Sequence, residues 1–434
     1  MAGGKGTRIA SITNDEIPKP MLTVGGKTIL EHQIECLKKS GVDEVIIVTG
    51  HLGEKIRDYF KDGSLLGIKI SYYEEDPNKP LGTAGSLYYL KDNIEEDFIL
   101  IFGDVFLSVD FNKMAEYHHK HSSDATLLTH PNSHPFDSDL VVVDDTGKVT
   151  GFDSKENNRD YDYKNLVNSG IYMFSPRVFD YVPEPKKCGL EKDVIAKMIT
   201  SGDKVYSYHS TEYVKDMGTP ERYYSVNDDY ANGLCEHRNL SHKQKAIFLD
   251  RDGTINVHIP FLVNKDEFEL IDGVSEAIKM INSSEYLCIV VTNQPVIARG
   301  ECTFTELDEI HKRMETLLGR DGAYIDGLYF CPHHKDKGFP GEVPELKFDC
   351  DCRKPKIGML KKAAEDYNID LSESIVIGDS TLDIKMAENA HMKSILVKTG
   401  QAGLDNKYKV RPDEVAEDLL SAVKMIIKSE ERRR

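Results

Sequence analysis

Residues 246–254 read AIFLDRDGT, an apolar run of four residues that leads directly into Asp250, Asp252 and a Gly-Thr pair. A short apolar run of this kind is typical of a strand buried in a parallel sheet. The two aspartates then stand at the carboxyl end of that strand, where open sheets bind their ligands. One carboxylate can attack a substrate while the other handles the proton, so this stretch predicts both a fold class and a reaction.

Similar apolar runs alternate with helical patterns along the rest of the chain. Strands are predicted at 44–49, 98–102, 246–249, 287–292 and 374–377, and helices at 29–39, 306–318 and 357–367. The alternation predicts an α/β protein with parallel sheets flanked by helices. Because 434 residues are too many for one core, and a new strand pattern follows the polar stretch 231–245, we expect two Rossmann-like doubly wound domains in tandem, at 1–232 and 243–434.

The composition limits the ligands. The chain has 73 acidic and 55 basic side chains, a net charge of −18, which disfavours binding to nucleic acid. Anionic ligands must therefore be held by local basic or metal sites. No apolar run approaches the roughly 18 residues that span a bilayer, and no signal peptide opens the chain. The eight cysteines are expected to be reduced, as in a cytoplasmic protein. We predict an enzyme that acts on small molecules in the cytoplasm and has no membrane partner. The sequence leaves its oligomeric state undecided.

Two glycine-rich loops and a constrained lysine mark the first half. In GGKGTR (3–8), Gly3 and Gly4 let backbone N–H groups approach a polyphosphate, and Arg8 can neutralise it. An ordinary turn is the alternative. In PKPM (18–21), flanking prolines stiffen the backbone around Lys19, which suits charge stabilisation at phosphorus, although a turn with a solvated lysine has the same pattern. A second loop, LGTAG (81–85), precedes a helix.

Two aspartates of this half are candidate magnesium ligands. Asp104 follows a predicted strand, and Asp216 lies in KDMGTPE (215–221). Carboxylates placed in this way can hold a magnesium ion that bridges phosphates. Taken singly, each aspartate also fits a helix cap or a turn.

The whole of residues 1–230 resembles the sugar-phosphate nucleotidyltransferases. The motifs GGKGTR, PKPM, LGTAGSL, FGDV, VNSGIY, LEKD and KDMGTPE occur in the order of that family. The resemblance implies transfer of a nucleoside monophosphate to a sugar 1-phosphate with release of pyrophosphate. The LGTAGSL form is similar to the guanylyl-transferring branch, which implies GTP as donor. The roles that the resemblance implies are phosphate stabilisation by Arg8 and Lys19, magnesium binding by Asp104 and Asp216, a base pocket at Leu81, Gly82, Thr83 and Ala84, and sugar-phosphate contacts from Asn168, Glu191 and Lys192.

The start of the chain departs from that family. An apolar strand normally precedes the glycine loop, whereas here Met1 stands directly before Ala2-Gly3-Gly4. Without this strand the sheet lacks a central ladder and the loop lacks a rigid base. Either the start is truncated or this half is impaired, and the intact later motifs favour a truncated start.

The second half supplies partners for Asp250. Thr292 and Asn293 end a predicted strand and offer a hydroxyl and an amide to a phosphate, and Lys354 offers a charge to the transferring phosphoryl group. Asp379 and Asp383 follow the strand 374–377. We expect a magnesium site formed by Asp250, Asp252 and Asp379.

This order resembles the haloacid-dehalogenase (HAD) phosphatase superfamily. The resemblance implies an aspartyl-phosphate at Asp250. It also implies that Asp252 protonates the leaving oxygen and then activates water.

Four further residues predict a zinc-bound loop at 331–352. Cys331, His333, Cys350 and Cys352 provide three sulfurs and one imidazole, a tetrahedral structural set. A closed site of this kind should fold the loop over the catalytic pocket, with His334 as a spare neighbour. The remaining cysteines are expected to be ordinary thiols: Cys36, Cys188, Cys235, Cys288 and Cys302.

The motif CPHH…CDCRKPKIGM narrows the resemblance to heptose bisphosphate and histidinol-phosphate phosphatases. The long segment between its metal pairs is more similar to the heptose type. In that group the pair Arg353-Lys354 meets substrate phosphate. The loop 258–263 and the pair Pro295-Val296 depart from the usual pattern, and both are expected to border the pocket.

The two resemblances together constrain the substrate. A phosphatase acting on the distal phosphate of D-glycero-D-manno-heptose 1,7-bisphosphate yields the sugar 1-phosphate that a guanylyltransferase consumes. The combination implies a bifunctional enzyme that makes GDP-heptose, with the α anomer at C1. Two alternatives stay open: a mannose or hexose 1-phosphate transferase fused to a broader or histidinol-phosphate-type phosphatase, and an impaired first half that only binds nucleotide sugars.

Overall fold

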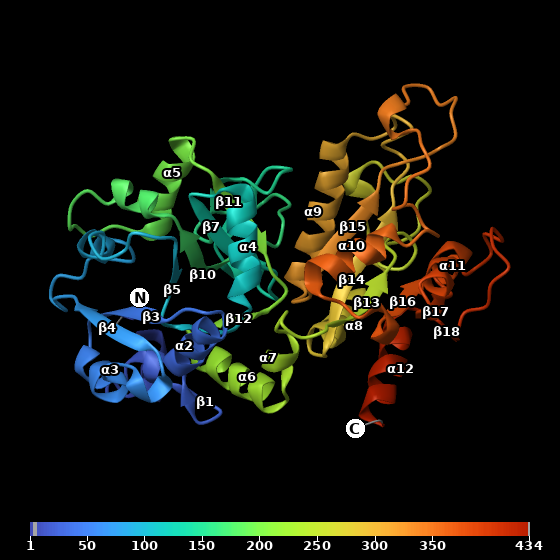
Figure 1. The fold of residues 1–434 in the computed structure, drawn as a ribbon. Coiled ribbons are helices and arrows are strands. Elements are labelled where there is room, and N and C mark those ends of the chain that lie inside the picture. The colour runs from blue at the N-terminus through green and yellow to red at the C-terminus, as the bar shows by residue number, and fades with distance from the viewer. Residues whose placement is uncertain (3–6, 433–434) are drawn as a thin grey trace. The chain divides into compact units, whose positions relative to one another are not determined.

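The computed structural model describes residues 1–2 and 7–432, so Gly3 and Gly4 lie outside the described residues (Figure 1). The chain divides into two compact units. The first comprises Met1–His130, Asp139–Ser154 and Leu166–Asn239, and the second comprises Pro131–Ser138, Lys155–Asn165 and Leu240–Arg434. The main division, between Asn239 and Leu240, falls inside the polar stretch 231–245. The two short segments that cluster with the second unit were not predicted.

The first unit is a mixed α/β structure. Its strands are β1 (Thr23–Val24), β2 (Lys27–Thr28), β3 (Glu44–Thr49), β4 (Lys69–Glu74), β5 (Phe98–Ile101), β6 (Val105–Ser108), β7 (Ala125–His130), β8 (Leu140–Val143), β9 (Val149–Asp153), β10 (Val167–Phe174), β11 (Val205–His209) and β12 (Tyr213–Asp216). Its α-helices are α1 (Ala10–Thr13), α2 (Ile29–Lys39), α3 (Gly53–Phe60), α4 (Phe111–His121), α5 (Ala196–Thr200), α6 (Pro220–Ala231) and α7 (Leu234–His237). The bounds predicted for β3 and α2 are confirmed.

The main sheet of this unit is not the expected parallel one. Its order is β11-β7-β10-β8-β9, with β5 also paired to β10. β10 runs antiparallel to β5, β7 and β8, whereas β11 runs parallel to β7. Antiparallel neighbours such as β8 and β9 need only a short turn, so no helical crossover marks them in the sequence. The prediction of a doubly wound parallel sheet was therefore wrong for this unit.

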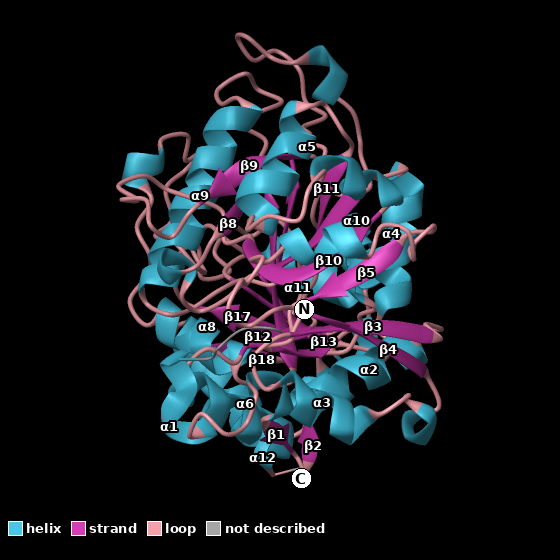
Figure 2. Ribbon diagram, turned by 90° about the vertical axis from the view of Figure 1, so that its left-hand side faces the viewer, coloured by secondary structure: helices cyan, strands magenta, loops and turns pink. Residues whose placement is uncertain are grey.

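β3 and β4 form a separate parallel pair, seen side by side in Figure 2. Met1 and Ala2 lie between this pair and β5. The amine of Met1 donates to Ile101 O at 2.8 Å, and Ala2 N donates to Val48 O at 2.8 Å. Burial lowers the pKa of the Met1 amine to about 6. Among the described residues, Ala2 forms an isolated parallel bridge with Thr49 at the end of β3.

The second unit contains the expected parallel sheet. Its order is β15-β14-β13-β16-β17-β18, and every pairing is parallel. The strands are β13 (Lys245–Leu249), β14 (Tyr286–Asn293), β15 (Gly327–Cys331), β16 (Ile375–Gly378), β17 (Lys393–Val397) and β18 (Glu414–Ala416). The α-helices are α8 (Val274–Asn282), α9 (Phe304–Arg320), α10 (Gly358–Tyr367), α11 (Thr381–Asn389) and α12 (Leu419–Glu431).

Helices cover both faces of this sheet, which explains the uninterrupted apolar run of β13. Ile247 and Leu249 pack into a core with α8 and α12, whereas Ala246 and Phe248 pack into a second core with α10 and α11. Successive side chains of a strand point to opposite faces, so a strand with a core on each side must be apolar throughout. Among the described residues, no helix combines the length and the apolar character needed to cross a membrane.

Candidate active sites

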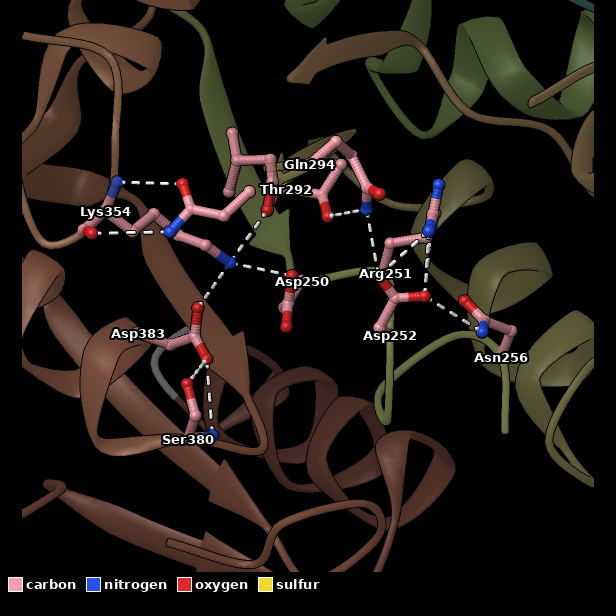
Figure 3. A network of polar contacts seen from close by, with 11 residues as sticks. Asp250, Arg251, Asp252, Asn256, Thr292, Gln294, Lys354, Ser380 and Asp383 are labelled. Atoms are coloured by element: carbon pink, nitrogen blue, oxygen red, sulfur yellow. Dashed lines mark hydrogen bonds and ion pairs between the residues drawn. The ribbon is translucent and has the colours of Figure 1, made fainter. Parts of the chain in front are cut away.

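Lys354 is the centre of the site at the end of β13 (Figure 3). Its Nζ donates to Asp250 Oδ1 and to Asp383 Oδ1, both at 2.7 Å, and to Val291 O at 3.1 Å. Asp383 Oδ2 in turn accepts from Ser380 Oγ at 2.5 Å at the start of α11. The ammonium group is therefore held beside Asp250 by contacts from three elements, in a position from which it could stabilise a phosphoryl group on Asp250.

Asp379 faces the same centre from the loop after β16. Its Oδ2 accepts from Gln401 N at 2.6 Å. A Cβ on Gly253 would lie 2.2 Å from this oxygen, and one on Gly400 would lie 2.1 Å from it. Only glycine at these two positions leaves space for the carboxylate.

The site fits a divalent cation. Carboxylate oxygens of Asp250, Asp379 and Asp383 lie within 4.8 Å of one another, and all three residues are buried. Burial raises the pKa of Asp250 to about 7, although the Lys354 ammonium opposes the shift. Burial, together with Asp250 and Asp383, raises the pKa of Asp379 to about 8. Three buried carboxylates against one lysine leave negative charge that a hard cation such as Mg²⁺ would balance.

The Asp252 carboxylate lies outside this cluster, and magnesium binding by Asp252 stays a prediction. Both of its oxygens accept from Arg251 Nη2 at 2.9 Å, and Gln294 Nε2 donates to Oδ2 at 2.9 Å. Figure 3 shows the carboxylate turned toward Arg251 and Asn256. Burial opposes its ionisation, but Arg251 and the hydrogen bonds from Gln294 and Asn256 keep its pKa below the usual value. Asp383 is the third carboxylate of the cluster with Asp250 and Asp379.

The role of Arg251 was missed in the sequence. Its side chain is fully buried, and its Nη1 donates to His311 Nε2 at 3.2 Å. Burial and the Arg251 charge hold the pKa of His311 well below its usual value, so this imidazole is a neutral acceptor. Arg251 lies between two predicted catalytic residues, but its partner His311 lies on α9, 60 positions away. The signal for Arg251 that the sequence offered was its position in the motif 250–254.

The Asn293 side chain forms hydrogen bonds with the backbone of Lys354. Its Oδ1 accepts from Lys354 N at 3.0 Å, and its Nδ2 donates to Lys354 O at 3.3 Å. The Thr292 hydroxyl accepts from Gln294 Nε2 at 2.9 Å. Arg353 Nη1 donates to His333 O at 3.1 Å, which ties the Arg353-Lys354 pair to the predicted metal loop.

The predicted zinc ligands come together. The Cys331 and Cys350 sulfurs are 3.5 Å apart, the Cys350 and Cys352 sulfurs are 3.3 Å apart, and His333 Nδ1 lies 3.2 Å from Cys352 Sγ. Ligand atoms around a tetrahedral ion with bonds of about 2.3 Å lie about 3.8 Å apart. The three sulfurs and the imidazole nitrogen therefore fit zinc in both chemistry and spacing.

In the first unit, Asp104 and Asp216 lie at the same end of the β6–β12 pair, because Asp216 is in register with Val105. Lys19 Nζ lies 2.6 Å from Asp104 Oδ2, and Arg222 pairs with Asp216. Burial opposes the charge on Asp216, but Arg222 keeps its pKa below the usual value. Each predicted magnesium ligand thus already faces a cation, and magnesium binding there stays a prediction.

Arg222 is a cation that sequence reasoning missed. A Cβ on Gly218 would lie 3.5 Å from Arg8 Nη2 and 3.7 Å from Arg222 Nη1, so both guanidinium groups lie next to this glycine. Arg222 follows KDMGTPE directly, and this position was the signal available in the sequence.

The predicted base loop lies against the predicted sugar-phosphate residues. Thr83 Oγ1 accepts from Leu190 N at 2.8 Å, and Cys188 N donates to Leu81 O at 3.0 Å. A Cβ on Gly82, whose φ is +79°, would lie 2.4 Å from Cys188 O. Glycine at this position therefore allows the two segments to make contact.

Tyr172, which the sequence did not single out, joins two predicted residues. Its hydroxyl donates to Glu191 Oε1 at 2.6 Å, and Asn168 Nδ2 donates to that hydroxyl at 2.8 Å. Asn168 Oδ1 is buried and has no hydrogen-bond partner in the described structure. Lys192 follows Glu191 in the turn Leu190–Ile195.

Comparison with known proteins agrees with this division. Residues 1–233 match the nucleotidyl transferase family model, and residues 351–422 match the HAD-hydrolase-like model. The D-glycero-beta-D-manno-heptose-1,7-bisphosphate 7-phosphatase of Haemophilus ducreyi is 41% identical over 161 residues, which cover 37% of this chain and 86% of that protein. The chain belongs to the nucleotidyl transferase family in its first half and to the HAD-type phosphatases in its second.

Each half has further relatives. The transferase half is similar to the mannose-1-phosphate guanylyltransferase of Mycobacterium tuberculosis, 31% identical over 237 residues, with 54% of this chain and 64% of that protein covered. Among solved structures, HddC from Yersinia pseudotuberculosis is 27% identical, with a TM-score of 0.46. The match covers 53% of this chain and 96% of the HddC chain. The phosphatase half is 30% identical to the D,D-heptose 1,7-bisphosphate phosphatase of B. bronchiseptica, with a TM-score of 0.38 and coverage of 43% and 99%.

Proposed function

We propose that the chain makes a nucleotide-activated heptose in two steps. The phosphatase half, residues 243–434, removes the C7 phosphate of D-glycero-D-manno-heptose 1,7-bisphosphate. The transferase half, residues 1–232, then joins GMP from GTP to the resulting heptose 1-phosphate and releases pyrophosphate. The observation that carries the proposal is the presence, on one chain, of a heptose-bisphosphatase-like site and a domain whose family consumes sugar phosphates.

In the first step, the Asp250 carboxylate attacks phosphorus while the bond from phosphorus to the C7 oxygen breaks. Lys354 Nζ lies 2.7 Å from Asp250 Oδ1. From there it stabilises the negative charge on the transferring phosphoryl group. Asp252 gives a proton to the leaving C7 oxygen and then accepts one from the water that hydrolyses the aspartyl-phosphate. Because Arg251 keeps the pKa of Asp252 below its usual value, Asp252 must first turn from Arg251 toward the substrate and take up a proton from water before it can act as an acid. Asp250, Asp379 and Asp383 would hold a divalent cation, which would supply further positive charge to the transferring phosphoryl group.

In the second step, a phosphate oxygen of heptose 1-phosphate attacks the α-phosphorus of GTP, and pyrophosphate leaves. Lys19, Arg8 and Arg222 neutralise the triphosphate, and Asp104 and Asp216 would hold the magnesium ion that accompanies it. Asn168 and Glu191 meet the sugar phosphate, with Lys192 beside them. The support is the grouping of these side chains in the structure.

We also propose a structural zinc ion at Cys331, His333, Cys350 and Cys352, and a cytoplasmic location. The cluster geometry supports the zinc ion.

The decisive experiment uses the full chain with Mg²⁺, GTP and heptose 1,7-bisphosphate, and follows phosphate, pyrophosphate and nucleotide sugar together. Release of both ions with GDP-heptose is expected. Phosphate without pyrophosphate would mean a working phosphatase beside an inactive transferase or a wrong nucleotide. Release of neither ion by metal-loaded protein would refute the heptose assignment.

The anomer at C1 requires its own comparison. The curated phosphatase relatives are named for the β anomer, whereas the guanylyl route resembled by the transferase half implies the α anomer. We propose the α anomer. Parallel assays with the two 1,7-bisphosphate anomers should give a higher kcat/KM for α, and a preference for β would reject this part of the proposal.

A second candidate is mannose 1-phosphate as the acceptor of the transferase half. The similarity to a mannose-1-phosphate guanylyltransferase favours it. A higher kcat/KM with mannose 1-phosphate than with heptose 1-phosphate would establish this alternative.

A further inference from the structure

Arg299 lies between two aromatic rings from different loops of the phosphatase half. Its guanidinium carbon is 4.2 Å from the ring centroid of Phe261 and 4.6 Å from that of Phe339. Its Nη2 donates to His334 Nε2 at 3.4 Å. Phe261 belongs to the loop 258–263, and Phe339 to the loop 331–352, so one cation joins the two segments that border the predicted pocket.

The backbone fixes the same arrangement. Ala298 N donates to Pro332 O at 3.2 Å, and Val343 N donates to Ala298 O at 3.1 Å. Phe261 has a φ of +58°, a left-handed conformation that a bulky aromatic residue rarely adopts. Phe261 is nevertheless 54% exposed, so burial does not account for this conformation, and its ring contacts the Arg299 guanidinium.

The charge of Arg299 is not balanced by a carboxylate. Among the described residues no acidic group forms an ion pair with it, and its Nε is buried without a hydrogen-bond partner. The neighbouring Lys347, whose Nζ lies 4.5 Å from the Phe339 ring, differs because Glu342 pairs with it at 3.3 Å. Asp336 lies 3.8 Å from His334 Nε2, and its side chain is 68% exposed.

A second guanidinium lies close by. Arg353 binds the carbonyl of His333, while Arg299 binds the ring of His334, the next residue. Arg353 also directly precedes Lys354, which contacts Asp250. Arg353 is thus adjacent in sequence to Lys354 of the reaction centre, and Arg299 contacts the residue that follows the one Arg353 contacts.

We propose that Arg299 binds the phosphate group that the reaction leaves on the sugar, and that it makes the phosphatase half selective for sugar bisphosphates. Phe261 and Phe339 fix the guanidinium plane, and the buried Nε–H, together with the N–H groups of Arg299 not used by His334, donates to phosphate oxygens. The inference rests on the proposed function, because it assigns a residue to the second phosphate of that substrate.

The test measures inhibition of p-nitrophenyl phosphate hydrolysis by heptose 1-phosphate, without GTP, so that only the phosphatase site reports. In Arg299→Gln the inhibition constant of heptose 1-phosphate should rise about 10- to 100-fold, as expected for one or two lost charge-assisted hydrogen bonds. The inhibition constant of inorganic phosphate, which needs only the Asp250 end, should change less than about threefold. Arg299→Lys, which keeps the charge, should recover part of the affinity.

Arg411→Gln, at an exposed arginine of the same unit, serves as the matched control and should change neither constant. An equal rise of both constants in Arg299→Gln would assign Arg299 a purely structural role and overturn the inference, as would a lack of inhibition of the wild type by heptose 1-phosphate. Phosphate release from heptose 1,7-bisphosphate by the wild type tests the proposed function separately. That release can occur while Arg299→Gln behaves as wild type, in which case only this inference fails.

Discussion

Gly253 and Gly400 set the position of Asp379 from two sides. A side chain at either glycine would overlap the Asp379 carboxylate, at 2.2 and 2.1 Å. These residues carry no chemical group of their own, and their contribution to the site is the space they leave. A positive φ alone does not account for this role, since other glycines with positive φ, such as Gly202, have no atom within 4 Å of a Cβ built on them.

Gly253→Ala should therefore abolish phosphatase activity. Gly253 (φ +87°) and Gly202 (φ +86°) have nearly the same backbone, but nothing lies within 4 Å of a Cβ on Gly202. Both alanine variants should lose roughly 1 kcal/mol of stability to left-handed strain. Only Gly253→Ala should also lower the rate with p-nitrophenyl phosphate by at least about 100-fold, because it displaces Asp379. Equal rates in the two variants would contradict the assigned position of Asp379.

At the scale of elements, the loop 331–352 depends on its four clustered side chains. Cys350→Ser should lower bound zinc from one ion per chain to a small fraction, because a hydroxyl is a poor ligand for this ion. Trypsin should then cleave the loop at the exposed Lys335 or Lys337. Metal analysis by mass spectrometry and a digestion time course check both results. Cys302→Ser, a buried thiol outside the cluster, should retain the metal. A purified wild-type protein that contains no bound zinc would contradict the assignment of this cluster as a zinc site.

Helix α4 predicts a pH dependence of stability. His118 is 1% exposed, and burial lowers its pKa despite the opposing charges of Asp97 and Asp124. Because its folded pKa lies below the unfolded value of about 6.5, its contribution to stability is complete above that pH and is lost as the pH falls toward the folded pKa. The slope is at most about 1.4 kcal/mol per pH unit for one proton.

The neighbouring residue provides the control. His118→Gln should flatten the decline of the melting temperature between pH 6.5 and 5, whereas His119→Gln, whose side chain is 63% exposed, should not. Calorimetry at several pH values measures both slopes. An unchanged slope in His118→Gln would exclude this residue as the source.

For the whole molecule, the two centres should work independently. Asp250→Asn should lose phosphate release by roughly a thousandfold or more, because it removes the nucleophile, but should still make GDP-heptose from added heptose 1-phosphate. Lys19→Met should lose transfer by about 100- to 1,000-fold and retain the phosphatase.

A mixture of these two variants should again make GDP-heptose from the bisphosphate, since the intermediate can diffuse between molecules. Coupled release of phosphate and pyrophosphate measures this recovery. Loss of both activities in either single variant would show that the halves are not independent.

Much of the second unit could be predicted from sequence. The apolar run 246–249 lies in β13, the pattern at 306–318 lies in α9, and the four zinc candidates lie together. These predictions succeeded because they depend on local periodicity and on motifs with fixed chemistry. The mixed sheet of the first unit was missed, since pairing direction depends on strands far apart in the chain.

The sequence by itself determined the two halves and their reaction classes. Only the tertiary structure decided the partner of each side chain: Asp383 rather than Asp252 in the carboxylate cluster, Arg251 on His311, Arg222 on Asp216, and Arg299 between Phe261 and Phe339. Residue type and spacing fix what a side chain can do and where its strand ends. The electrostatic field at a side chain comes from groups that only the folded chain brings within a few ångströms. That field sets the charge of the side chain and the direction in which it points.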